Sequence, residues 1–249
     1  MAAWTQGMWA RSSYPDLMHC KHLGTDAYSY GSILKFLTHF IMSGNGTPEK
    51  NLSEVWARLI AYSANPFSYM KLSMYDRGSD QFPLLRGKSA QIRHFGNVLL
   101  AVFRYYMDER ELTHRLIRQL LQASIEFESI LDDNDSAFKL PLSAANALLK
   151  QARRYALCVQ GLRNEFGVRE LLFHITPKFH YLLHIAEYSK QINPKLVWCY
   201  GAEDFVGKIK GLIGPNQVAT RHWKVCSKVC FKYLVGLDCE LRRVRLSPS

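Results

Sequence analysis

Residues 92–106 read IRHFGNVLLAVFRYY, and residues 112–131 read LTHRLIRQLLQASIEFESIL. In both stretches apolar side chains recur every three or four positions, the spacing that places them on one face of an α-helix. The same spacing recurs in residues 52–60 and 142–162. The pattern therefore predicts amphipathic helices that bury their apolar faces against one another.

Between these stretches lie segments that favour turns and helix ends. Residues 43–48 (SGNGTP) and 132–136 (DDNDS) are expected breaks, and residues 73–83 are an expected loop. Thr176-Pro177 predicts a helix start, with threonine as the cap and proline in the first turn. Only residues 171–175 and 195–200 are plausible short strands. We therefore expect a mainly α protein with a compact helical body and at most one or two short strands.

Composition limits the class of protein. The 249 residues are 48% hydrophobic and 12% aromatic, which excludes a disordered chain. No apolar run reaches the roughly 18 residues of a membrane-spanning helix, and the N-terminus lacks the apolar core of a signal peptide. The six cysteines lack the dense spacing of a disulfide scaffold, so we expect reduced thiols. These features predict an intracellular protein with no membrane partner.

Positive charge is concentrated at the C-terminus. The chain carries +11, and residues 205–249 hold nine Lys/Arg against two acidic residues, a net +7. Such a segment attracts polyanions, and nucleic acid is the obvious candidate; the alternative is a solvated, solubilising surface. The candidate DNA-binding residues are Arg221, Lys224, Lys228, Lys232, Arg242, Arg243 and Arg245.

Three short segments carry the remaining signals. The first contains Asp16, Met18, His19, Leu23 and Gly24. By itself it is explained by Asp16 capping a helix, with His19 on its first turn. The second contains Thr176, Pro177, His180 and His184, and the third contains Trp198, Cys199, Tyr200, Glu203 and Gly207.

Taken together and in this order, the three segments resemble those of CACTA-type DNA transposases. That family has an RNase H-like fold in which three carboxylates bind two divalent metal ions, Mg²⁺ or Mn²⁺, for phosphodiester cleavage and strand transfer. The resemblance implies that Glu203 is a relic of the third carboxylate. It also implies that His19 faces the scissile phosphate and that Asp16 is not itself a metal ligand.

The resemblance divides the chain in two. Residues 1–170 would be the helical insertion of the catalytic domain. Residues 171–249 would hold a truncated RNase H-like remnant and the basic helix, both packed in one unit with the insertion. Another chain covering residues 171–212 is a further possible partner.

The sequence also departs from the family pattern. Asp204 and Val206 stand where the pattern has arginine and asparagine. The first two metal-binding aspartates would lie upstream of Asp16, on strands that fifteen residues cannot supply. We therefore expect no catalysis and no cofactor for this chain alone, with Mg²⁺ or Mn²⁺ bound only if other carboxylates complete the site around Glu203.

Two histidine-containing clusters could bind metal instead. His180, His184 and Glu187 share one helical face and could hold zinc; the alternative is a polar face turned to solvent or DNA. His222, Cys226 and Cys230 recur every four residues, but the helical pattern places both cysteines on an apolar face with Leu234. Core packing is the expected role of these cysteines.

These observations leave two functional hypotheses. The first is a transposase-derived, catalytically incomplete DNA-binding protein, for which nuclear residence follows from the resemblance and the charge. The second is a non-enzymatic helical protein-interaction module with no nucleic-acid role.

Overall fold

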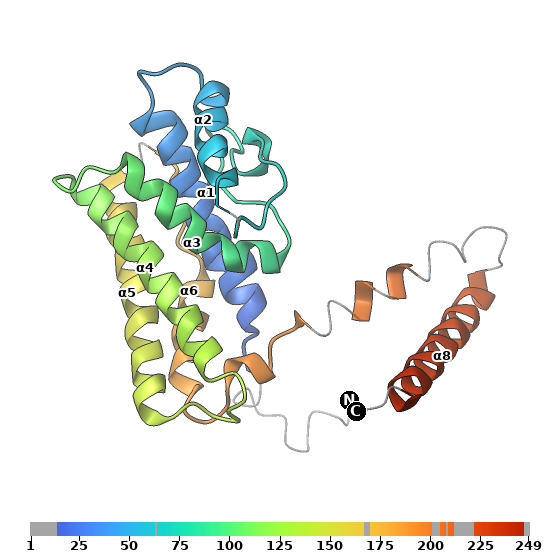
Figure 1. The fold of residues 1–249 in the computed structure, drawn as a ribbon. Coiled ribbons are helices and arrows are strands. Elements are labelled where there is room, and N and C mark those ends of the chain that lie inside the picture. The colour runs from blue at the N-terminus through green and yellow to red at the C-terminus, as the bar shows by residue number, and fades with distance from the viewer. Residues whose placement is uncertain are drawn as a thin grey trace. The chain divides into compact units, whose positions relative to one another are not determined.

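The structure, a computed structural model, describes residues 14–62, 64–166, 170–200, 205–207, 209–211 and 222–246. It contains two compact units, one ending at Trp198 and the other beginning at Cys199. The first unit is a helical body, shown with its helices labelled in Figure 1. It includes residues 171–198, which the sequence grouped with the C-terminal region.

One long helical segment runs through the centre of the body. It consists of a π-helical stretch, η2 (Met18–Asp26), then α1 (Ala27–Phe36), then a second π-helical stretch, η3 (Leu37–Ile41). All but two residues of both η2 and α1 are buried. This segment is central because η2 contacts α3 and α6, and α1 also contacts α3.

The predicted amphipathic helices surround this segment. They are α2 (Pro48–Ile60), α3 (Ser89–Tyr106), α4 (Leu112–Asp133) and α5 (Leu142–Phe166). The last two pack side by side as a hairpin (Figure 1). The apolar faces predicted from the spacing form the core, with Ile92, Phe95, Leu120, Leu148 and Tyr155 all buried.

The expected helix starts and breaks are largely confirmed. Thr47 caps α2 by accepting a hydrogen bond from the Lys50 amide at 3.4 Å. A short 3₁₀ turn, η4 (Leu72–Met74), interrupts the expected loop. Helix α6 (Pro177–Tyr188) begins at Pro177 as predicted, but the Thr176 hydroxyl makes no capping hydrogen bond.

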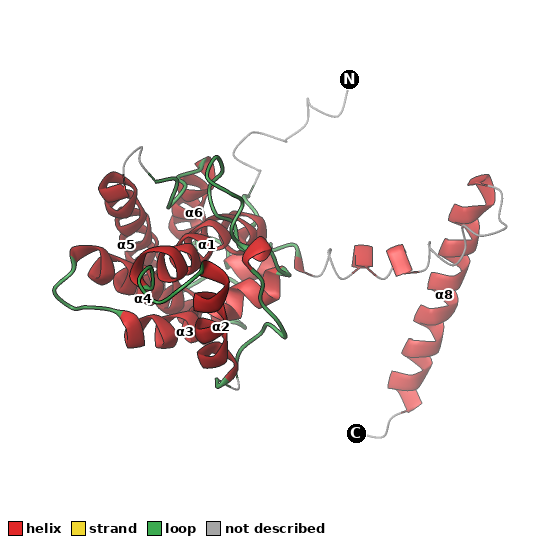
Figure 2. Ribbon diagram, turned by 90° about the horizontal axis from the view of Figure 1, so that it is seen from above, coloured by secondary structure: helices red, strands yellow, loops and turns green. Residues whose placement is uncertain are grey.

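The mainly α fold class is confirmed, and the described residues contain no strand (Figure 2). Residues 171–175 and 195–200 are therefore not strands. In the first segment, Phe173 has a φ of 55°, which is not an extended conformation. Its amide donates to the Ser32 hydroxyl of α1 at 2.9 Å instead of to a neighbouring strand. In the second, Asn193 caps the 3₁₀ turn η5 (Pro194–Leu196).

The C-terminal unit is described mainly by its long helix, α8 (His222–Leu246). Val229 is buried, and the Tyr233 ring packs edge-to-face with Phe205 at a centroid distance of 5.3 Å. None of the helices in the described ranges combines the length and apolar character needed to cross a bilayer.

Candidate functional site

A cluster of charged side chains lies inside the body, where η2 crosses α4. The Lys21 ammonium is buried, and it donates to the Asp26 carboxylate at 2.8 Å and to the Ser124 hydroxyl at 2.9 Å. It also forms an ion pair with Glu128 Oε1 at 2.9 Å. Burial lowers the pKa of Lys21, but the attraction of Asp26 and Glu128 outweighs it and raises the net value. Lys21 is therefore a permanently charged ammonium, not a nucleophile.

Glu128 collects three nitrogen contacts and is only 12% exposed. One carboxylate oxygen faces both Lys21 and the His22 Nε2, the latter at 2.9 Å, and the other accepts from Arg93 Nε at 2.9 Å. Burial alone would raise the pKa of this carboxyl. Lys21, His22 and Arg93 together hold it well below its usual range.

The hydroxyl groups around Asp26 complete the interior of the cluster. The Tyr155 hydroxyl lies 3.0 Å from Asp26 Oδ1 and 2.9 Å from the Ser29 hydroxyl. The Tyr30 and Ser124 hydroxyls are 2.9 Å apart. Burial and the neighbouring Asp26 raise the pKa of both tyrosines, so both hydroxyls remain protonated and neutral.

The cluster reaches the surface through Arg93. Its guanidinium also contacts Asp132, which in turn pairs with Lys195 at 2.9 Å. Three cations, Lys21, Arg93 and Lys195, thus alternate with three carboxylates, those of Asp26, Glu128 and Asp132. Asp26, Lys21 and Glu128 form the interior part of this row, where balanced charge allows ionised groups to persist at low dielectric, whereas Asp132 is 50% exposed.

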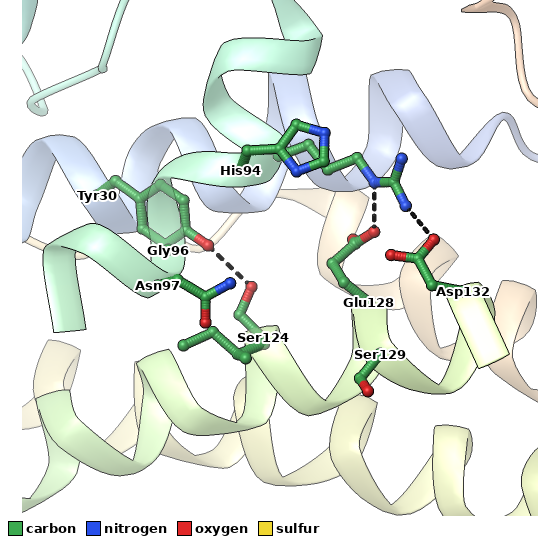
Figure 3. A pocket seen from close by; sticks show the side chains of 10 residues that line it. Tyr30, His94, Gly96, Asn97, Ser124, Glu128, Ser129 and Asp132 are labelled. Carbon is green, nitrogen blue, oxygen red and sulfur yellow. Dashed lines mark hydrogen bonds and ion pairs between the residues drawn. The ribbon is translucent and has the colours of Figure 1, made fainter. Parts of the chain in front are cut away.

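A cavity of about 360 Å³ lies beside this row of charged side chains, between α3 and α4 (Figure 3). Tyr30, Ser124 and Glu128 line the cavity, together with the exposed side chains of His94 and Asn97 of α3. Gly96 is required here, because a Cβ at this position would lie 2.7 Å from the Tyr30 hydroxyl oxygen. The cavity has donors and acceptors for a small polar molecule.

His22, Asp26 and Glu128 lie close enough together to hold a metal ion. The Lys21 ammonium already occupies the position that such a cation would take, since it contacts both carboxylates. A metal would have to displace it and leave a buried, unpaired ammonium. The donor set therefore does not fit a metal site.

The structure places Asp16 and His19 at the start of the central helix. The Asp16 carboxylate accepts from the His19 amide at 2.9 Å and from the Met18 amide at 3.4 Å, so Asp16 caps the helix. It also contacts His19 Nδ1. The imidazole is 48% exposed. Asp16 therefore orients the partly exposed imidazole of His19 through its Nδ1 atom.

His180, His184 and Glu187 lie on the outer surface of α6. The two Nε2 atoms are 2.9 Å apart, and Glu187 faces the other nitrogen of His184, Nδ1, at 3.8 Å. The two histidines are brought together as the spacing predicted. Glu187 is not positioned as a third ligand, because it lies at the opposite edge of the ring.

Helix α8 exposes Lys224, Lys228 and Lys232. Arg221 and Glu203 lie outside the described residues, and the side chains of Arg242, Arg243 and Arg245 are likewise outside the description. The predicted apolar role of Cys230 is wrong, because this thiol and Leu234 are exposed. The buried side of α8 is centred on Val229 and Tyr233 instead; the side chains of His222 and Cys226 are not described.

Sequence reasoning missed the buried charge cluster. A signal for it existed in α4, where one position of the buried face between Leu121 and Phe127 is polar rather than apolar. Ser124 occupies that position and Glu128 lies one turn later, so both face the core. Four residues separate Lys21 from Leu17, which likewise placed the lysine on a core-facing side.

No protein-family model matches the chain, and neither a curated protein nor a solved structure is significantly similar to it.

Proposed function

We propose that this chain is a transposase-derived protein that binds DNA through the basic face of α8. The observation that carries this proposal is the row formed by Lys224, Lys228 and Lys232, which are all exposed and recur every four residues. The row spans about 12 Å of helix, a length over which duplex DNA presents about seven phosphates. Three ammonium groups at this spacing can contact a phosphate backbone without reading bases.

The transposase part of the proposal is supported by the local geometry of the first motif, in which Asp16 orients an exposed His19. Two-metal cleavage requires several converging carboxylates. Within the described ranges, no three carboxylates converge within reach of one metal ion. We therefore propose DNA binding without strand cleavage. The nuclear location is proposed from the transposase resemblance and the positive charge.

The test is duplex DNA binding by the full chain across a salt titration. Each phosphate contact contributes about −0.9 to the slope of log K against log salt, so three lysines contribute about −3. The Lys224→Glu/Lys228→Glu variant should reduce the magnitude of the slope by about 2 and weaken binding at low salt.

A matched control separates a local surface from overall charge. Lys139 and Lys190 are exposed lysines of the body, and Lys139→Glu/Lys190→Glu changes the net charge by the same amount. If the control variant loses as much affinity as the α8 variant, binding does not depend on α8. Absence of binding at low salt would refute the proposal outright.

A groove on the α4–α5 hairpin favours a second candidate, a protein-interaction module. The groove encloses about 670 Å³ and is lined by Leu116, Leu149 and Leu157, with Lys150, Arg153 and Arg154 among its other lining residues. Leu157 is 65% exposed. An apolar floor with cationic edges complements an amphipathic helix that carries acidic residues beside its apolar stripe.

The corresponding test uses a synthetic helical peptide with a leucine stripe flanked by glutamates, measured by fluorescence anisotropy. Leu157→Glu should abolish binding. Leu142→Glu, which alters an equally exposed leucine of the same helix outside the groove, should not. Equal binding of a peptide with lysines in place of the glutamates would contradict the charge complementarity.

A further inference from the structure

The surface of α6 carries a pair of histidines whose ring nitrogens point at one another. His180 and His184 are one turn apart, their ring planes meet at 83°, and the two Nε2 atoms are separated by 2.9 Å. His180 is exposed, and the His184 side chain is 38% exposed. The pair is therefore accessible from solvent and not sealed in the core.

We propose that His180 and His184 bind a divalent transition-metal ion of the zinc type through their Nε2 atoms. Zinc–imidazole bonds of about 2.0–2.1 Å at a tetrahedral angle place the two nitrogens about 3.3 Å apart. The observed separation of 2.9 Å is about 0.4 Å shorter, a difference that small side-chain rotations remove. The metal takes the place of the proton that the two imidazoles otherwise share, and water completes its coordination.

The neighbouring side chains fit this arrangement. Glu187 lies 3.8 Å from His184 Nδ1, the nitrogen that points away from His180. This distance is longer than a hydrogen bond. A rotation that brings the carboxylate within hydrogen-bond distance of Nδ1 would fix the tautomer that leaves Nε2 free to bind metal, and would strengthen the ligand. The Tyr188 ring lies nearly parallel to His184, with ring centroids 6.0 Å apart.

The chemistry of the donors selects the metal. Imidazole nitrogens suit zinc, nickel and copper, whereas magnesium and calcium take oxygen ligands. This site is therefore distinct from the two-metal carboxylate site that the transposase resemblance implies. It also does not depend on DNA binding by α8, because it lies in the helical body.

The test is isothermal titration of Zn²⁺ into the full chain, followed by Cu²⁺ electron paramagnetic resonance of the same variants. His180→Gln and His184→Gln should each remove one binding site and the two-nitrogen hyperfine pattern. Glu187→Gln should keep the site but weaken it about tenfold. His94→Gln changes an exposed histidine of α3 and serves as the matched control, with no expected loss.

Both histidines are exposed enough that glutamine should leave the fold intact, which the circular dichroism of each variant checks. Loss of one zinc site in both histidine variants, with the site retained in the control, supports the proposal. An unchanged number of zinc sites in either histidine variant overturns the proposal. So does a Cu²⁺ spectrum of the unsubstituted chain that lacks the hyperfine pattern of two coordinating nitrogens.

Discussion

Replacement of Lys21 by methionine tests the buried charge cluster most directly. Methionine has nearly the same length and volume, so the substitution removes the charge without leaving a cavity. The ammonium contacts Asp26, Ser124 and Glu128 at 2.8–2.9 Å. After its removal, Glu128 retains His22 and Arg93, whereas Asp26 retains only hydroxyl donors.

The expected cost follows from this arrangement. Removing one partner from a buried ion pair costs about 3–5 kcal/mol, because the other charge remains buried without compensation. For a body of this size each kcal/mol corresponds to about 2–4 °C in Tm. Lys21→Met should therefore lower the melting temperature by roughly 6–20 °C.

Urea unfolding followed by circular dichroism measures the loss. Lys195→Met is the matched control, because it also removes a lysine that contacts two carboxylates, but these are 50% and 70% exposed. That variant should lose about 1 kcal/mol or less. Lys21→Met/Asp26→Asn should recover part of the deficit by removing the stranded charge. If Lys21→Met costs no more stability than Lys195→Met, the cluster does not act as a coupled buried network.

Three further outcomes follow. The pKa of Glu128 is held well below its usual range. Its stabilising contribution is therefore present above the unfolded-state pKa of about 4.3 and is lost as the pH falls through the folded-state pKa. Glu128→Gln should reduce the loss of unfolding free energy at acidic pH, measured by urea titrations at a series of pH values. Gly31→Ala should destabilise the body by about 1–3 kcal/mol in urea titrations because its Cβ would lie 2.8 Å from the Leu85 amide nitrogen, whereas Gly44→Ala, which meets nothing within 4 Å, should be nearly neutral. Supercoiled plasmid incubated with the chain and Mg²⁺ should stay intact on a gel, and relaxation that Glu203→Gln abolishes would contradict the proposed lack of cleavage.

Helices α2 to α6 were predictable because each one carries its own signal. The apolar spacing in α3, α4 and α5 marks one buried face, and Pro177 and Pro48 mark helix starts. The prediction of two short strands was wrong for a physical reason. Short apolar runs such as residues 171–175 satisfy burial equally well as irregular chain when no strand pairs with them.

The candidate sites were predictable only where they depend on a single helix. Asp16 and His19, or His180 and His184, lie within one turn of each other, so spacing alone places them together. The interior cluster joins η2 to α3 and α4, and no local pattern reports which lysine meets which carboxylate.

The sequence by itself determined that this chain forms amphipathic helices with a basic C-terminal segment, because helical periodicity and charge are properties of neighbouring residues. Only the tertiary structure decided that Lys21, Asp26 and Glu128 form a balanced interior network, since residues more than 100 positions apart meet there. This outcome depends on how separate helices of the body pack, and packing is set by long-range contacts that no single segment encodes.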